Sequence, residues 1–346
     1  MMRMQVVNPV VFVLALVVAG WVGCKEKPVD EPDAVNVTQG VLILNEGNFQ
    51  NGNASLSYLD PQDSLHLDVF QRANGIPLGD VAQSMLLHDG ALWVVVNNSG
   101  KIYRLEFPDL RVSCLIQGLT SPRYILPLGP DKAYVSDLYA NAVSILDPTA
   151  CQTSGSWVSG GWVEEMKSIN GKVYACRTSG DQVWVVDPVG DTVLDSIWVG
   201  RGPVSMVQDA NGSLWVLCDG GLSGSLPSLH RIRPSDDSLL QSWSFTQVNS
   251  FPADLRCSPD GQTLYWLDGG IWRMSASDST LPTSPWIPEG GRNFYALGIN
   301  PVDGSIWASD AKDFVRKSEI LVWDQFGNLI KSFQAGINSG EFLFLP

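Results

Sequence analysis

The stretch Asn211-Gly212-Ser213-Leu214-Trp215-Val216-Leu217 joins a tight turn to a short apolar strand, and this unit decides the fold because it recurs. Each copy has a turn, usually containing glycine, and then an aromatic residue inside the strand. The aromatic positions are Trp93, Tyr134, Tyr174, Trp215, Tyr265 and Trp307. They follow one another at roughly 40–50 residues, a period typical of β-propellers, in which each repeat forms one four-stranded blade.

A second marker, an apolar strand that often ends in Asp-Pro, follows each turn–strand unit. Proline ends such a strand because it cannot donate to the hydrogen-bond ladder. A first turn–strand unit at residues 39–44 completes the set of seven. The second markers are residues 56–61, 102–105, 143–148, 183–188, 229–234, 271–274 and 321–324. We therefore predict an all-β fold, a seven-bladed β-propeller of four-stranded antiparallel blades over residues 39–346.

The two ends of this propeller are predicted to close it together. The first unit has no innermost strand before it, whereas residues 203–207 supply such a strand before the unit of Trp215. The tail, residues 341–346, is strand-like but has no blade of its own. We expect it to pair inside the first blade, which would remove an exposed sheet edge.

The N-terminus has the pattern of an export signal. Residues 1–24 contain Arg3 and an apolar centre at residues 10–19 that is too short to span a bilayer comfortably. The segment ends at Cys24, in a context that resembles a bacterial lipoprotein box, so we expect lipidation there and a membrane anchor. Residues 25–38 are charged and contain two prolines, which predicts a flexible acidic tether.

Composition excludes one class of partner. The net charge is −14, so we expect no nucleic acid partner, because phosphates need neutralising by Lys and Arg. The three histidines, His66, His88 and His230, show no sign of clustering in the predicted fold. A zinc site or a Ser-His-Asp apparatus therefore has little support, and we expect no metal and no cofactor.

Five cysteines follow Cys24, and an odd number leaves at least one free if all pairs are intramolecular. An exported chain permits disulfides. Cys176 and Cys218 lie at similar points of adjacent blades and could approach each other. The alternative is that they are small buried hydrophobic residues.

One face of the propeller is predicted to carry a binding site. The loops after the second strands and those leading into the next innermost strands share this face, and their residues are polar, aromatic or arginine. The candidates are Asn45, Asn48, Asn97, Arg123, Tyr124, Asp137, Tyr139, Trp162, Arg177, Arg201, Asp219, Phe251, Asp268, Arg292, Phe294 and Asp310. Rings supply contact area and amides supply direction, which suits a large amphipathic ligand or a protein partner. The alternative for each Asp and Asn is local capping of a turn.

The first blade resembles the opening of the YncE-like β-propeller lipoproteins of the Bacteroidetes. The resemblance is carried by Ile43-Leu44-Asn45-Glu46-Gly47-Asn48-Phe49, by residues 53–61 and by the tail residues 336–342. That family includes the BtuG type, surface lipoproteins that capture cobalamin and related corrinoids for a TonB-dependent outer-membrane transporter. The resemblance implies a corrinoid ligand, such a transporter as partner, and an outer-membrane location facing the cell exterior. The acidic residues behind Cys24 are similar to the export tag of such lipoproteins.

The sequence thus favours a monomeric, non-enzymatic propeller that captures a ligand at the cell surface. Two alternatives remain open. One is an adhesion or interaction module for protein or glycan. The other is a metal-dependent enzyme of the lactonase or lyase kind, for which Asp137, Asp219, Asp268 and Asp310 would have to converge in the central funnel.

Overall fold

The computed structural model describes residues 36–221, 224–246 and 250–345. The described residues belong to one compact unit. The predicted signal peptide, Cys24 and most of the predicted tether lie outside the described residues. Within residues 36–38, Val37 is fully buried, and its N–H donates to the Pro108 carbonyl at 3.4 Å. The packed part of the chain therefore includes Val37, which precedes the predicted propeller boundary.

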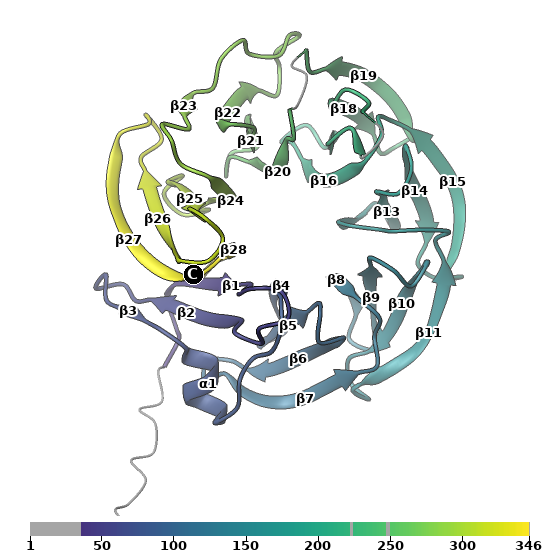
Figure 1. The fold of residues 1–346 in the computed structure, drawn as a ribbon. Coiled ribbons are helices and arrows are strands. Elements are labelled where there is room, and N and C mark those ends of the chain that lie inside the picture. Colours follow the sequence, from purple (N-terminus) through teal and green to yellow (C-terminus); the bar gives the residue numbers. More distant parts are fainter. Residues whose placement is uncertain (1–35, 222–223, 247–249, 346) are drawn as a thin grey trace, which may run out of the picture. The chain divides into compact units, whose positions relative to one another are not determined.

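Seven four-stranded antiparallel sheets follow one another around a ring, which confirms the predicted seven-bladed β-propeller (Figure 1). Blade 1 consists of β28 (Ser339–Leu345), β1 (Gly40–Asn45), β2 (Ser55–Leu59) and β3 (Leu65–His66). Blade 2 consists of β4 (Ala82–His88), β5 (Ala91–Val96), β6 (Lys101–Glu106) and β7 (Arg111–Gln117). Blade 3 consists of β8 (Pro122–Gly129), β9 (Lys132–Asp137), β10 (Ala142–Asp147) and β11 (Gln152–Val158). The short helix α1 (Val69–Asn74) links blades 1 and 2.

The remaining four blades repeat the same order from the innermost to the outermost strand. Blade 4 consists of β12 (Met166–Ile169), β13 (Lys172–Arg177), β14 (Gln182–Asp187) and β15 (Thr192–Trp198). Blade 5 consists of β16 (Pro203–Gln208), β17 (Leu214–Cys218), β18 (Ser228–Arg233) and β19 (Ser238–Ser244). Blade 6 consists of β20 (Ala253–Cys257), β21 (Thr263–Leu267), β22 (Gly270–Ser275) and β23 (Ile287–Pro288). Blade 7 consists of β24 (Phe294–Ile299), β25 (Ile306–Asp310), β26 (Lys317–Trp323) and β27 (Leu329–Ile337).

The strands are apolar to different degrees because the blades stack on one another. All six residues of β5 are buried, since a second strand is covered by the blade on either side. The outermost β7 alternates between exposed and covered residues, as expected for a strand with one face in solvent. The core is accordingly divided into layers between adjacent blades. One layer joins Trp93 and Ile102 of blade 2 to Val135 and Leu146 of blade 3.

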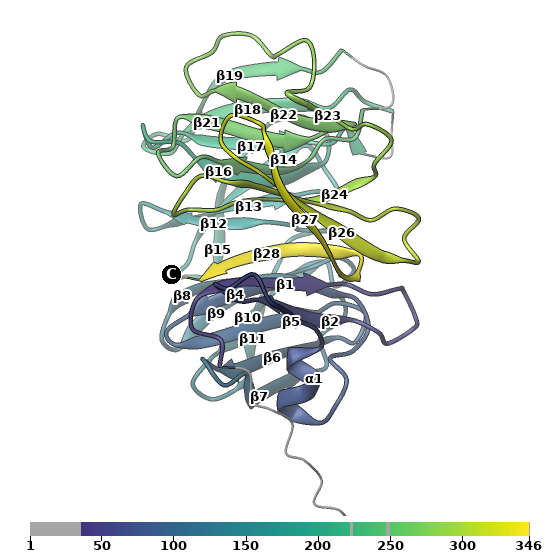
Figure 2. The ribbon, with the colours of Figure 1, turned by 90° about the vertical axis from the view of Figure 1, so that its left-hand side faces the viewer.

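The C-terminal strand β28 pairs with β1, which confirms the predicted closure (Figure 2). The register places Phe342 opposite Ile43 and Phe344 opposite Val41. Asn45, at the end of β1, fixes the same joint, because its side-chain oxygen accepts from the Gly336 N–H at 3.0 Å and from the Ser339 hydroxyl at 2.6 Å. The two ends of the propeller are thus tied inside one sheet.

The cysteines pair differently from the pairing considered above. A disulfide joins Cys114 of β7 to Cys151, the residue before β11, and so links blades 2 and 3. Cys176 and Cys218 are both fully buried in one apolar cluster, and along the described part of the chain they are free, as is Cys257. A disulfide between Cys176 and Cys218 is therefore ruled out in this structure, and the alternative that both are small buried hydrophobic residues is confirmed. No helix among the described residues is long and apolar enough to cross a membrane.

Candidate functional site

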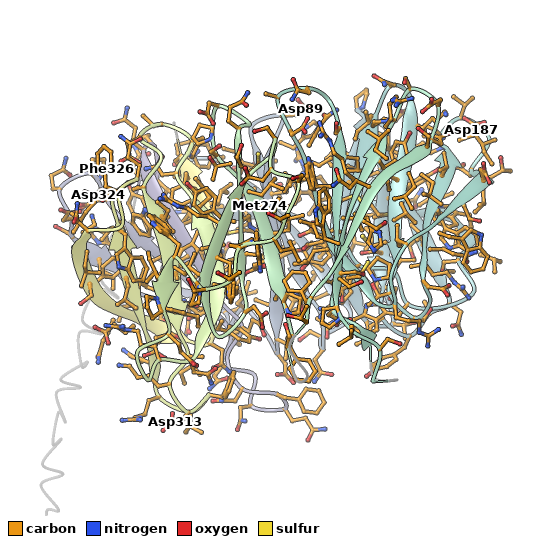
Figure 3. All side chains as sticks on the ribbon, turned by 90° about the horizontal axis from the view of Figure 1, so that it is seen from above. Asp89, Asp187, Met274, Asp313, Asp324 and Phe326 are labelled. Atoms are coloured by element: carbon orange, nitrogen blue, oxygen red, sulfur yellow. A yellow bond between two sulfur atoms is a disulfide. The ribbon has the colours of Figure 1, made fainter. Side chains whose placement is uncertain are left out.

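The two faces of the propeller carry different loops. The loop after β25 contains Asp313, and we call its side the mouth face. The turns around Asp89 and Asp187 join first to second and third to fourth strands, and we call their side the turn face. Figure 3 shows Asp89 and Asp187 on one side of the ring and Asp313 on the other. The candidate residues lie in the loops of the mouth face or at the ends of the strands that these loops join.

Four candidates at or just after the ends of second strands are used inside the protein. Asn45, Asn97, Asp137 and Asp310 are at most 8% exposed. The Asp137 carboxylate accepts from the backbone N–H groups of Ser121, Tyr139 and Ala140, each at 2.8 Å. The Asp310 carboxylate likewise accepts two loop N–H groups at 2.9 Å. The two carboxylates thus cap loops of the backbone, and the Asn97 side chain donates to Ser121 and Pro122 of the next blade.

Five candidates from several blades line one cavity at the mouth face, with a volume of about 320 Å³. They are Arg123, Tyr124, Trp162, Asp219 and Phe251. The Asp219 carboxylate accepts the Gly221 N–H at 2.7 Å, and burial raises the pKa of this carboxyl group. Phe251 is 70% exposed. The cavity thus combines an arginine and three aromatic rings with four carboxylates, because Glu164, Glu165 and Asp254 also line it.

A second cavity, also of about 320 Å³, adjoins the first. Phe251 and Ala253 line both cavities, and Asp268 and Phe294 contribute to the second. The Asp268 carboxylate accepts from the Ser250 hydroxyl and from the Phe251 N–H, so it holds the ridge that separates the two cavities. A third cavity of about 250 Å³ lies further along the channel and shares Tyr124 and Glu165 with the first. We call these three adjoining cavities together the hollow of the mouth.

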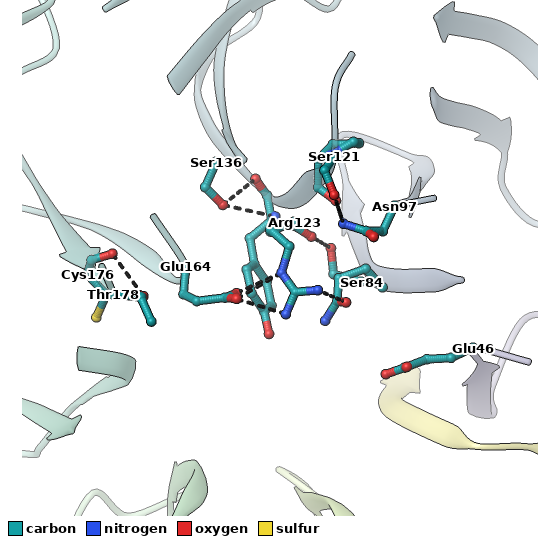
Figure 4. A network of polar contacts seen from close by, with 12 residues as sticks. Glu46, Ser84, Asn97, Ser121, Arg123, Ser136, Glu164, Cys176 and Thr178 are labelled. Carbon is teal, nitrogen blue, oxygen red and sulfur yellow. Dashed lines mark hydrogen bonds and ion pairs between the residues drawn. The ribbon is translucent and has the colours of Figure 1, made fainter. Parts of the chain in front are cut away.

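The wall of the channel contains a paired arginine. The Arg123 guanidinium lies 2.8 Å from the Glu164 carboxylate and also donates to the Gln83 side chain (Figure 4). Burial raises the pKa of Glu164, while Arg123 and the adjacent Trp162 lower it. The pair joins blades 2, 3 and 4, so Arg123 acts as a tie across three blades.

A second arginine neutralises two further carboxylates. Arg256 lies 3.0 Å from Asp254 and 3.4 Å from Glu165. Glu165 accepts the Met206 N–H at 2.8 Å, and Asp254 accepts the Leu297 N–H at 2.8 Å. Each carboxylate therefore bridges its own innermost strand to that of the next blade. Burial raises the pKa of both acids, and the charge of Arg256 opposes that shift.

Two more acids lie near the joint of the ring. The Tyr295 hydroxyl donates to the Glu46 carboxylate at 2.7 Å, and burial raises the pKa of Glu46 to about 7. Glu341 accepts the Met85 N–H at 2.5 Å, and burial raises its pKa to about 8. Figure 4 shows Glu46 across the channel from the Arg123–Glu164 pair. These acids titrate near neutral pH and have no arginine in direct contact among the described ion pairs.

Besides the four buried caps, five further candidates lie outside the lining of these three cavities. Asn48 donates to the Phe314 carbonyl, Tyr139 is 69% exposed, and Arg177 lies over the ring of Trp184 at 5.4 Å. Arg201 is exposed and Arg292 is half-buried. The structure thus gathers part of the candidate set and leaves these five around the rim.

The sequence analysis missed five charged residues of the channel as site residues: Glu46, Glu165, Asp254, Arg256 and Glu341. A signal for four of them was present, because they lie within or just before innermost strands, where alternate residues face the axis. Glu46 was present in the first-blade pattern but was not assigned a role. Among the residues that the structure describes, no group of three or more His, Cys, Asp and Glu could hold a metal ion.

Comparison with known proteins places the chain in a family. A model described as a domain of unknown function, DUF5074, matches residues 39–338. The chain belongs to this family. The comparison with curated proteins found no match.

Solved structures show the same fold at low sequence identity. A quinonprotein alcohol dehydrogenase-like protein from Bacteroides thetaiotaomicron is 16% identical with a TM-score of 0.73, over 89% of this chain and 79% of that one. The periplasmic gluconolactonase of Pseudomonas aeruginosa is 15% identical with a TM-score of 0.67, over 89% and 99%. A 6-phosphogluconolactonase-like structure from Bacteroides fragilis is 15% identical with a TM-score of 0.63, over 88% and 98%. At such identities the likeness concerns the fold alone.

Proposed function

We propose that this DUF5074 propeller is a non-enzymatic capture protein that binds a large amphipathic ligand at its mouth face. The observation that carries the proposal is the hollow of the mouth, in which the exposed Phe251 side chain forms the ridge between two adjoining cavities of about 320 Å³ each. Concave sites with aromatic walls and a few polar groups are the usual form of small-molecule sites.

The charges beneath the mouth support binding rather than chemistry in this proposal. Arg123 and Arg256 are held by carboxylates, and Glu165, Asp254 and Glu341 accept backbone N–H groups of neighbouring strands. Groups engaged in this way hold the innermost strands in place. The aromatic ridge and the outer edges of the mouth are left for a ligand.

A corrinoid is the ligand that we propose to test first, because the first blade resembles the BtuG-type lipoproteins. A corrinoid is large, has a flat apolar ring system and carries amide groups, which suits rings for area and polar groups for direction. Delivery to a TonB-dependent transporter, an outer-membrane location and lipidation at Cys24 belong to the same proposal. The disulfide Cys114–Cys151 supports export, since disulfides persist in oxidising compartments.

Equilibrium binding of cyanocobalamin to the purified protein tests the proposal. We expect saturable binding, and we expect Phe251→Ala and Trp162→Ala each to weaken it by about tenfold, the scale of an aromatic contact at the centre of an interface. Phe326→Ala is the matched control, because Phe326 is 75% exposed in the turn between β26 and β27, on the turn face.

Three results would count against the proposal. Absence of binding at micromolar cobalamin would remove the corrinoid as ligand. Equal affinities of the Phe251 and Phe326 variants would remove the mouth as the site. The ligand should also be recovered chemically unchanged, and its conversion would overturn the non-enzymatic assignment.

A further inference from the structure

A cavity on the turn face lies between blades 2 and 3, and of its lining residues only Ile125 also lines the third cavity of the channel. The volume of the turn-face cavity is about 410 Å³, within the roughly 300–1,000 Å³ of typical small-molecule sites. Blade 2 contributes His88, Trp93 and Arg104 to its lining, and blade 3 contributes the apolar Ile125, Pro127 and Pro148. Asp89, whose place on the turn face is labelled in Figure 3, lies at its edge.

Blade 5 shows what a tryptophan and an arginine in this arrangement bind. Trp215 and Arg231 lie opposite each other on β17 and β18, with the guanidinium 5.3 Å from the centre of the indole ring. The carboxylate of Asp209 accepts from the Trp215 N–H at 2.9 Å and lies 3.3 Å from Arg231. The Asp209 side chain is 0% exposed. The protein's own aspartate therefore satisfies both donors in blade 5.

Blade 2 repeats the two donors without the aspartate. Trp93 and Arg104 lie opposite each other on β5 and β6, with the guanidinium 5.8 Å from the indole ring. The position of Asp209, which faces the residue two before the tryptophan, is occupied by His88. Trp93 is only 3% exposed.

The two donors of blade 2 also lack a carboxylate from elsewhere. Among the described residues, no hydrogen bond of the Trp93 N–H and no ion pair of Arg104 is present, and the guanidinium donates only to the Ser113 hydroxyl at 3.2 Å. Asp89 is turned to His88, 3.4 Å away, and is 74% exposed. The N–H of a buried indole ring and an arginine thus line the cavity without an acceptor of opposite charge.

The adjacent blade does not supply the carboxylate at this junction, although it does at the next two. Asp191 of blade 4 lies 2.7 Å from Lys132 and accepts from the Tyr134 hydroxyl of blade 3. Asp237 of blade 5 does the same for Lys172 and Tyr174 of blade 4. The equivalent residue of blade 3, immediately before its fourth strand and also with positive φ, is Cys151. Cys151 forms a disulfide with Cys114 and therefore supplies no carboxylate to the cavity.

We propose that this cavity binds a small organic carboxylate with a flat, apolar body. The ligand's carboxylate takes the place that Asp209 has in blade 5, accepting from the Trp93 N–H and the Arg104 guanidinium. Its body lies against Ile125, Pro127 and Pro148. Charge-assisted hydrogen bonds from arginine to carboxylate are about twice as strong as neutral ones, so the carboxylate is the group that the site recognises first.

Isothermal titration of the full protein with benzoate, and with benzamide as its uncharged match, tests the assignment. We expect benzoate to bind with one-to-one stoichiometry and benzamide to bind at least tenfold more weakly, as expected for loss of a charge-assisted bond. Arg104→Gln should weaken benzoate binding by tenfold or more, whereas the matched Arg231→Gln should change it less than twofold. Equal effects of the two variants, or binding of benzamide as tight as that of benzoate, would overturn the proposal.

A second variant rebuilds the arrangement of blade 5. His88→Asp places a carboxylate at the position of Asp209, and we expect it to compete with benzoate and to reduce binding by at least tenfold. His88→Asn has the same shape without the charge and should retain binding within about threefold. Unchanged affinity in His88→Asp would overturn the proposed donor set. Tighter binding of an acidic peptide than of benzoate would overturn the small-molecule assignment in favour of a protein partner.

Discussion

Blades 2 and 5 carry the same pair of donors, a tryptophan and an arginine on neighbouring strands, and differ in what the pair meets. In blade 5 the buried Asp209 accepts from both Trp215 and Arg231. In blade 2 the equivalent position is His88, and a cavity of about 410 Å³ lies beside the donors. The comparison shows that one repeat can hold either a closed structural contact or an open cavity, and that the two blades differ in one carboxylate.

The same distinction applies to the channel. Arg123 and Arg256 are paired, and three carboxylates accept backbone N–H groups of the next innermost strand. These charges resemble blade 5 in being satisfied within the protein. By contrast, Trp93 and Arg104 of blade 2 have no carboxylate partner among the described residues, and the Phe251 ring at the mouth is exposed. Our two proposals concern these two places.

The largest expected effect separates blade 5 from blade 2. Asp209 accepts from the Asn211 and Ser213 N–H groups at 2.9 Å each as well as from Trp215 and Arg231. Asp209→Ala should lower the free energy of unfolding by about 3–4 kcal/mol, because it leaves buried donors and an arginine unpaired. Urea unfolding measures the difference. The matched His88→Ala in blade 2 should cost no more than about 0.5 kcal/mol, as for an ordinary surface change, and equal costs would break the comparison.

The next effect concerns the covalent tie at the junction of blades 2 and 3. Cys114→Ser removes the disulfide to Cys151. At the junctions of blades 3–4 and 4–5 an ion pair takes the place of this disulfide. We expect a loss of about 2–4 kcal/mol in the free energy of unfolding, the usual value for a native disulfide. Cys257→Ser, at a free cysteine, is the control in the same urea experiment. A loss no larger than that of the control would contradict a structural role for the bond.

The smallest effect concerns Glu46, whose pKa is raised to about 7 from an ordinary value of 4.5. The folded protein holds the proton of Glu46 more tightly than the unfolded chain does. The stability that the protonated carboxyl group contributes to the fold is therefore present below pH 4.5 and is lost as the pH rises through 7. Glu46→Gln should therefore raise the free energy of unfolding by about 1–2 kcal/mol at pH 8, with the partial exposure of the channel reducing the effect, and by much less at pH 5. A difference that is the same at both pH values would show that ionisation of Glu46 costs no stability.

The sequence was sufficient for the ring and its closure, because these depend on local patterns. The turn and aromatic residue of the Trp215 unit recur in each of blades 2 to 7. The strand-like tail at residues 341–345 had no other place to pair. The mouth was predicted in part. Trp162 and Phe251 line its cavity, whereas Asn45 and Asp137 are buried caps.

The parts of the candidate site that the sequence did not predict depend on contacts between residues that are distant in the chain, and no local pattern contains such contacts. Glu341 accepts from Met85, and Arg256 reaches Glu165, only because the ring brings these innermost strands together. The pairing of Cys114 with Cys151 was missed for the same reason. Comparison of the turns would have helped, since Cys151 occupies the position that Asp191 and Asp237 have in the next two blades.

The indole N–H resonances of Trp93 and Trp215 provide the most direct test of the central claim, that a carboxylate missing from blade 2 leaves a binding site. The two signals can be assigned with Trp93→Phe and Trp215→Phe in protein labelled with ¹⁵N, and benzoate is then titrated. We predict a saturable shift of the Trp93 signal and none of the Trp215 signal, because Asp209 already occupies the latter. A Trp93 signal that stays in place, or two signals that move together, would contradict the claim.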